Sequence, residues 1–144
     1  MLNINVSLGA VAGAIANGSE SERWFIDLEH DRLFMVSALF QTDEEVEKAV
    51  DMINSNPENY ISLPYLTHEE FLDEVEMYTR TLSDKPVLAK YLQKAVAEKA
   101  PRTYIRQLLN REPGQNQDFA NFYSERVQER ASIWAEKQGI KFIG

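Results

Sequence analysis

The sequence contains no cysteine, only 2 histidines and no long apolar run. The lack of cysteine excludes disulfides, thiolate nucleophiles and zinc or iron–sulfur centres held by thiolates. This composition fits the cytoplasm, where disulfides are rare, and we expect the protein there. No apolar run approaches the roughly 20 residues that span a bilayer, so we expect no membrane partner.

The first residues also lack the charge of a leader peptide. No lysine or arginine precedes Arg23, and Asn3, Asn5 and Ser7 interrupt the apolar character of the segment. A secretory leader has a basic start and a continuous apolar part. We therefore interpret this segment as part of the fold.

The composition predicts a globular protein with an uneven distribution of charge. The chain has 144 residues, 44% of them hydrophobic and 26% charged, and we expect one domain over residues 1–144. Residues 1–78 carry 3 basic and 16 acidic side chains, whereas residues 79–144 carry 12 basic and 7 acidic ones. Two interpretations stay open: the two halves attract each other, or each meets a partner of opposite charge.

Strands are predicted in the first half of the chain. Two aromatic and β-branched runs, residues 23–28 and 33–36, predict a β-hairpin with a polar loop at residues 29–32. Residues 60–63 predict a short extended segment that can serve as a third strand, and Pro64 ends it.

The hairpin loop resembles the start of a calcium-binding loop in its spacing of acids, Asp27-x-Glu29-x-Asp31. A calcium loop needs glycine at its sixth position, where this sequence has Arg32. We therefore interpret the loop as a solvated turn.

Helices are predicted from capping residues and apolar spacing. Two capping boxes, Thr42 with Glu45 and Thr67 with Glu70, each start a helix. Ser7 starts a predicted helix over residues 8–16, and another covers residues 118–138 before Gly139. A short predicted helix has Pro101 in its first turn. A further helix is capped by Ser83 or Asp84, and its predicted inward residues are Val87, Leu88, Tyr91, Leu92 and Ala95.

The predicted fold is a helix-rich α+β domain. A small antiparallel hairpin, with the third short strand, is packed by five to six helices. Residues 1–64 form a mixed portion and residues 65–144 a helical portion.

Several segments resemble a known family. They are residues 56–60 leading to Leu63-Pro64, the acidic helix with Met77 ahead of Leu82-Ser83-Asp84, residues 100–104 with Leu108, Phe119-x-x-Phe122-x-x-x-Arg126 with Ile133-Trp134 and Gly139-Ile140, and the hairpin from Phe25 to Val36. In residue type and spacing, they resemble uncharacterised protein family 0158, a group of small bacterial proteins. The resemblance covers most of residues 20–142 and implies no substrate, cofactor or mechanism.

Four acidic residues of one predicted helix are candidates for binding a basic partner: Glu69, Glu70, Asp73 and Glu74. Acids in a first turn also stabilise the helix dipole. Like charges four residues apart repel, which suggests compensation by the basic half or by a partner. His68 lies beside them, but neither histidine has the spacing of a metal site, and we expect no metal and no cofactor.

Four arginines are candidates for binding an anionic partner: Arg102, Arg106, Arg126 and Arg130. They form two pairs four residues apart, as do Lys90 and Lys94, so each pair shares a helix face. The sequence has no glycine-rich phosphate loop and no nucleophile elbow.

Three hypotheses follow. The first is a non-catalytic cytoplasmic module that binds a protein partner through the acidic helix or the basic helices, with self-association left open. The second is a nucleic-acid-associated regulator that uses the basic pairs. The third is a hydrolase with a carboxylate and His68 at its site. We favour the first, without enzymatic activity, and expect the functional surface where the two charged halves meet.

Overall fold

The computed structural model describes residues 2–144, which form six α-helices, one 3-10 turn and five short strands. They group into two units, residues 1–66 with 127–144 (unit 1) and residues 67–126 (unit 2). The prediction of a helix-rich α+β fold is confirmed, whereas one domain over residues 1–144 stays a prediction. Among the described residues, no helix combines the length and apolarity needed to cross a membrane.

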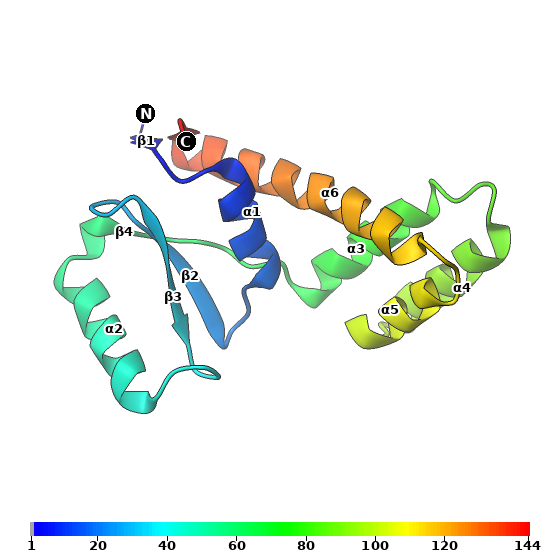
Figure 1. Cartoon of the computed structure of the whole chain (residues 1–144), viewed down its shortest axis with the longest axis horizontal. Coiled ribbons are helices and arrows are strands. Elements are labelled where there is room, and N and C mark those ends of the chain that lie inside the picture. Colours follow the sequence, from blue (N-terminus) through cyan, green and yellow to red (C-terminus); the bar gives the residue numbers. More distant parts are fainter. Residues whose placement is uncertain (1) are drawn as a thin grey trace. The chain divides into compact units, whose positions relative to one another are not determined.

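Unit 1 contains the predicted hairpin and third strand as one antiparallel sheet (Figure 1). Strand β2 (Glu22–Asp27) is central, between β3 (Arg32–Ser37) and β4 (Tyr60–Ser62). Ile26 of β2 is fully buried and is flanked by Leu33 and Ile61 on the neighbouring strands. These paired apolar side chains fix the register, because a slip of one residue would turn them to the other face.

Helix α1 (Leu8–Asn17) begins at Ser7, as predicted, where the Ser7 hydroxyl accepts a hydrogen bond from the Ala10 amide at 3.1 Å. Val11 and Ile15 are buried. The final part of α6 (Gln115–Gln138) also belongs to unit 1 and buries Val127, Ala131 and Ala135. Small side chains on both helices suit close packing.

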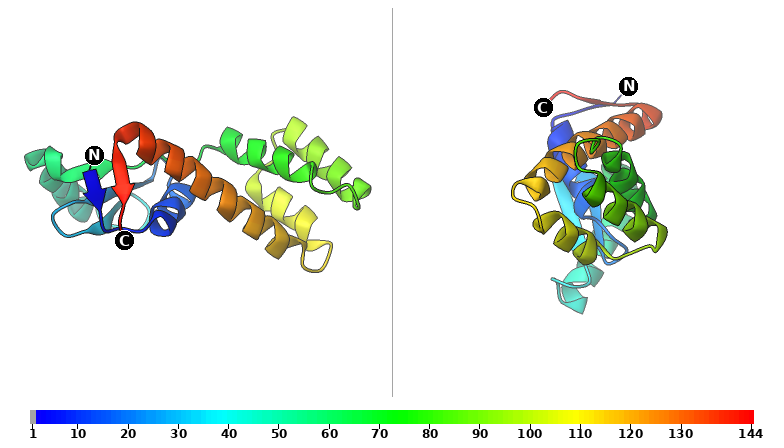
Figure 2. Two further views of the ribbon diagram at one scale, coloured as in Figure 1. Left: turned by 90° about the horizontal axis from the view of Figure 1, so that it is seen from above. Right: turned by 90° about the vertical axis from the view of Figure 1, so that its right-hand side faces the viewer.

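The sequence did not predict two strands at the ends of the described chain. Strand β1 (Leu2–Ile4) pairs in parallel with β5 (Ile140–Phe142), and the two arrows lie side by side in Figure 2. Gly139 ends α6 with a φ of 70° and accepts a hydrogen bond from the Leu2 amide at 2.8 Å. This left-handed residue lets the chain leave the helix and enter β5.

Helix α2 (Asp43–Ser55) begins with the predicted capping box and is followed by a 3-10 turn, η1 (Pro57–Asn59). Its apolar side is covered only in part. Ala49 is buried, Val46 and Ile53 are half-buried, and Val50 is exposed.

Unit 2 is helical and comprises α3 (His68–Thr79), α4 (Pro86–Ala97), α5 (Arg102–Asn110) and the first part of α6. The second capping box starts α3 as predicted. The predicted apolar stripe of α3 and the residues after it is buried throughout: Phe71, Leu72, Val75, Tyr78 and Leu82. Rings from α6 pack on it, with Phe119 edge-on to Tyr78 at 5.1 Å between ring centres.

Two predictions for α4 were wrong. The residue before the helix is Lys85, not Ser83 or Asp84, because Pro86 occupies the first helical position that proline favours. Val87 and Tyr91 do not point inward; they are 68% and 50% exposed. The buried stripe of α4 is narrower than predicted and consists of Leu88, Leu92 and Ala95.

The remaining helix boundaries differ slightly from the predictions. Pro101 precedes α5 instead of lying in its first turn, and α6 begins at Gln115, three residues earlier than predicted. Gly114, with a φ of 78°, adopts the left-handed conformation that glycine tolerates, and α6 starts at the next residue.

Candidate functional site

The four predicted acids of α3 have different environments. Glu69 and Asp73 are exposed. Glu70 is half-buried and accepts a hydrogen bond from the Thr67 amide at 3.0 Å, as the capping box requires. Glu74 is buried, with 1% of its surface exposed. A partner can therefore reach only part of this set directly.

Glu74 is joined to one of the predicted arginines. Arg126 of α6 donates from Nε to Glu74 Oε2 at 2.6 Å and from Nη2 to Glu74 Oε1 at 3.4 Å. The structure thus brings together one acid and one base from the two oppositely charged halves. A buried carboxylate needs such a partner, because an unpaired buried charge is costly.

The other predicted arginines lie on α5 and in the later part of α6. The guanidinium of Arg102 lies over the Phe71 ring at 4.6 Å, a cation–π contact. Arg106 is exposed on α5, and Arg130 is half-buried in unit 1. Binding of an anionic partner by the four arginines stays a prediction.

His68 lies against an aromatic ring. Its imidazole stacks on Phe71 with 6.2 Å between ring centres and 14° between ring planes. Within residues 2–144, no three histidine, aspartate or glutamate side chains gather closely enough to hold a metal ion. His68 therefore lies at the start of α3 with its ring against Phe71.

A chain of polar contacts in unit 2 had no signal in the sequence. The buried Tyr78 hydroxyl donates to Asp118 Oδ2 at 2.6 Å and accepts a hydrogen bond from the Gln115 side chain. Burial, together with the bond to Asp118, raises the pKa of Tyr78 far above its ordinary value of 10.0. Tyr78 therefore remains a protonated donor at any ordinary pH.

The chain of contacts continues to a lysine at the edge of a cavity. Lys85 Nζ donates to Gln115 Oε1 at 2.7 Å and to Glu112 Oε2 at 3.0 Å. The bond to Glu112 raises the pKa of Lys85, although desolvation opposes it. Beside it is an open cavity of about 360 Å³, with Asp84 and Asp118 in its lining. The polar groups of this chain of contacts satisfy one another. They connect the turn between α3 and α4 to the turn between α5 and α6.

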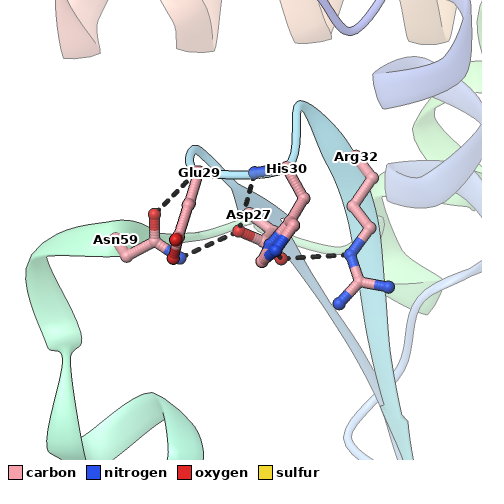
Figure 3. A network of polar contacts seen from close by, with 5 residues as sticks. All are labelled: Asp27, Glu29, His30, Arg32 and Asn59. Atoms are coloured by element: carbon pink, nitrogen blue, oxygen red, sulfur yellow. Dashed lines mark hydrogen bonds and ion pairs between the residues drawn. The ribbon is translucent and has the colours of Figure 1, made fainter.

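A second polar network closes the hairpin of unit 1 (Figure 3). Asp27 is completely buried, so the prediction of a solvated turn was wrong at this position. It accepts hydrogen bonds from Asn59 Nδ2 at 2.8 Å and from Arg32 Nε at 3.0 Å, and contacts His30 Nδ1 at 2.9 Å. Burial alone would raise the pKa of Asp27, but these hydrogen bonds outweigh it and lower the pKa to about 2.

The network leaves Asp27 no role toward an external cation. Asn59 also accepts a hydrogen bond from the Glu29 amide at 2.7 Å through its side-chain oxygen. Asn59 immediately precedes β4, so its hydrogen bonds to Asp27 and Glu29 link the start of β4 to the hairpin turn. The Asp27 network therefore stabilises the fold of unit 1.

The side of α4 that lies away from its buried stripe carries an exposed surface of mixed character. Val87, Lys90, Tyr91 and Lys94 are all exposed and follow the spacing i, i+3, i+4, i+7, which places them on one face. We call these four residues the α4 stripe. Helix α4 contains no acidic residue, and Arg111 lies over the Tyr91 ring at 6.0 Å. The stripe therefore combines apolar area with positive charge.

Among the described residues, neither lysine of the α4 stripe forms an ion pair. Lys90 and Lys94 were noted in the sequence as a basic pair, but the wrong inward placement of Val87 and Tyr91 hid the mixed character of the surface. The signal that could have revealed it was the alternation of Lys90 and Lys94 with Val87 and Tyr91 along one helical face.

A family model described as Uncharacterised protein family (UPF0158) matches residues 4–144. The match confirms the resemblance noted in the sequence and extends over residues of both units. No curated protein and no solved structure matches the chain.

Proposed function

The chain belongs to uncharacterised protein family UPF0158, whose name carries no activity, and we propose that it is a non-catalytic module that binds an acidic segment of a protein partner. The observation that carries this proposal is the α4 stripe. We place the protein in the cytoplasm, which the absence of cysteine supports.

The α4 stripe has the composition of a recognition surface. Val87 and Tyr91 are 68% and 50% exposed and offer apolar area, and tyrosine is enriched in protein interfaces. Lys90 and Lys94 alternate with them along the same face. An amphipathic segment with acids beside its apolar side chains would match both features, in the way that helices bind amphipathic partners. The lysines would then contribute chiefly to the choice of partner and to the rate of encounter.

Charge favours a protein partner over nucleic acid. The chain has a net charge of −8, which repels a polyanion at long range. Nucleic-acid affinity rises with the number of phosphates that are neutralised, and the α4 stripe offers only two lysines, with Arg111 beside them. The contact of His68 with Phe71 lends no support to a hydrolase.

A photo-crosslinker in place of Tyr91 tests the proposal. The variant Tyr91→p-benzoylphenylalanine is irradiated in cells, and the crosslinked peptide is identified by mass spectrometry. We expect crosslinks to protein segments rich in aspartate and glutamate, lost when Lys90→Glu and Lys94→Glu are added. The same crosslinker at Gln128, an exposed position of α6, is the matched control.

Three results would contradict the proposal. One is the absence of any crosslink beyond that at Gln128, and another is a crosslink that persists with both lysines reversed. The third is recovery of crosslinked RNA or DNA, which would instead support the nucleic-acid alternative.

A further inference from the structure

A second surface of the protein has the chemistry that the α4 stripe would bind. Ten large apolar side chains among the described residues are exposed, and four of them lie in residues 39–52. Leu39 and Phe40 are 72% and 76% exposed in the loop before α2, and Val50 and Met52 are 41% and 39% exposed on the helix itself. Exposed apolar side chains of this kind are available to a partner that covers the segment.

The same segment is strongly acidic. Helix α2 has five acidic residues and one lysine, and that lysine, Lys48, lies 3.6 Å from Glu44. Asp43, Glu47, Val50 and Asp51 are exposed and are spaced i, i+4, i+7, i+8, so they form one face. We call these four residues the α2 stripe. Among the described residues, none of its three acids forms an ion pair.

The α2 and α4 stripes are complementary in charge, and their helices are similar in length. One carries three acids beside an exposed valine, and the other carries two lysines that alternate with an exposed valine and an exposed tyrosine. Helices of 13 and 12 residues are about 20 Å and about 18 Å long, so the faces match along their length. The proximity of Phe40 to the start of α2 in the sequence supplies further apolar area.

We propose that α2 of one copy of this chain docks on α4 of a second copy. This inference rests on the proposed function and names a partner for it. The acids of the α2 stripe face Lys90 and Lys94, and Val50 with Phe40 covers Val87 and Tyr91. If a two-fold axis relates the copies, the contact occurs twice and closes a dimer. Such a contact is reversible and salt-sensitive, because its ion pairs lie near solvent.

Sedimentation and charge reversal test the inference. The wild-type chain is measured by sedimentation velocity from about 10 µM to about 1 mM, the range in which small polar interfaces dissociate. We expect the mean mass to rise with concentration. Raising the salt from about 50 mM to about 500 mM should weaken association about tenfold, since screening shortens the reach of the charges.

Two double variants test the charges. Lys90→Glu with Lys94→Glu reverses the charge of the α4 stripe, and Glu47→Lys with Asp51→Lys reverses charges of the α2 stripe. All four positions are exposed, and the capping box of α2 keeps Glu45. Each variant alone should lose self-association at least tenfold. An equimolar mixture should recover it, because the new acids of one variant meet the new lysines of the other. Circular dichroism checks that both variants keep their helices.

The outcomes separate this inference from the function on which it rests. A wild-type chain that stays monomeric up to about 1 mM, or self-association that survives both reversals, overturns the docking of α2 on α4. A crosslink from position 91 to another acidic protein would then leave the proposed function standing. A crosslink from position 91 to residues 39–55 of a second copy supports both.

Discussion

Arg126 donates two hydrogen bonds to Glu74, a carboxylate of which only 1% is exposed. The arginine is itself 31% exposed, so the pair lies at the edge of the helical unit with its negative member inside. The buried one of the five acidic side chains of α3 is thereby paired within the protein.

Removing the Arg126 side chain should therefore strongly destabilise the folded protein. We expect Arg126→Ala to lower the free energy of unfolding by about 3 kcal/mol, because it leaves a buried carboxylate without its bidentate partner. Urea denaturation followed by circular dichroism measures the loss. The matched control is Arg80→Ala, which removes an exposed pair with Glu76 at 3.6 Å and should cost less than about 0.5 kcal/mol. Equal losses in the two variants would show that Glu74 does not depend on Arg126.

The pKa of Asp27 predicts a pH dependence. Its ordinary value of 3.8 falls to about 2 in the folded protein, which corresponds to about 2 kcal/mol of stability when the group is ionised. This contribution is complete above about pH 5 and is lost progressively as the pH falls through 3.8 toward about 2 and below, because the unfolded chain takes up the proton first.

The variant Asp27→Asn tests that dependence. It should be less stable than the wild type at pH 6 and lose less stability between pH 5 and pH 2, as measured by urea denaturation at each pH. Asp73→Asn, on the exposed side of α3, is the control and should leave the pH profile unchanged. A parallel loss of stability with pH in Asp27→Asn and the wild type would refute the role of this carboxylate.

The Tyr78 hydroxyl should contribute to stability through two partners. Tyr78→Phe leaves Asp118 without its donor and the buried Gln115 without its acceptor, which should cost about 1–3 kcal/mol. Tyr104→Phe, on an exposed tyrosine of α5, should cost almost nothing. Thermal unfolding of the two variants compares them directly. A Tyr78→Phe protein as stable as Tyr104→Phe would mean that the polar chain is not coupled to folding.

Two glycines should respond to alanine in opposite directions. Gly139 has a φ of 70°, so Gly139→Ala is strained and should destabilise by roughly 1 kcal/mol. Gly13 lies within α1, and an added methyl group there meets no atom within 4 Å. Gly13→Ala should stabilise by about 0.5–1 kcal/mol, because glycine weakens a helix interior. Chemical denaturation of both variants checks the two signs, and a gain at Gly139 would contradict the assigned turn.

Local chemistry made part of the fold predictable. The capping boxes at Thr42 and Thr67 formed where predicted because their hydrogen bonds join residues three apart. The hairpin was predictable for the same reason, since its two strands are adjacent in the chain. At α4 the sequence did contain the correct signal, Pro86, but the nearby Ser83 and Asp84 are also common helix caps.

Distant contacts account for what was missed. Leu2 pairs with Ile140, and no local pattern marks two three-residue strands that meet across the whole chain. The burial of Asp27 depends on Asn59, which lies far along the sequence beyond α2. The outward α4 stripe was hidden because an apolar spacing alone does not say how wide the buried face of a helix will be.

The parallel pairing of β1 with β5 constrains the order in which the protein can fold during its synthesis. Leu2 is synthesised long before its partner Ile140, because almost all of the described residues lie between them. The residues of unit 2 form one continuous segment between these strands and are all available once Arg126 has been added. During translation, β1 therefore stays without its partner strand until the whole segment between β1 and β5 has been synthesised.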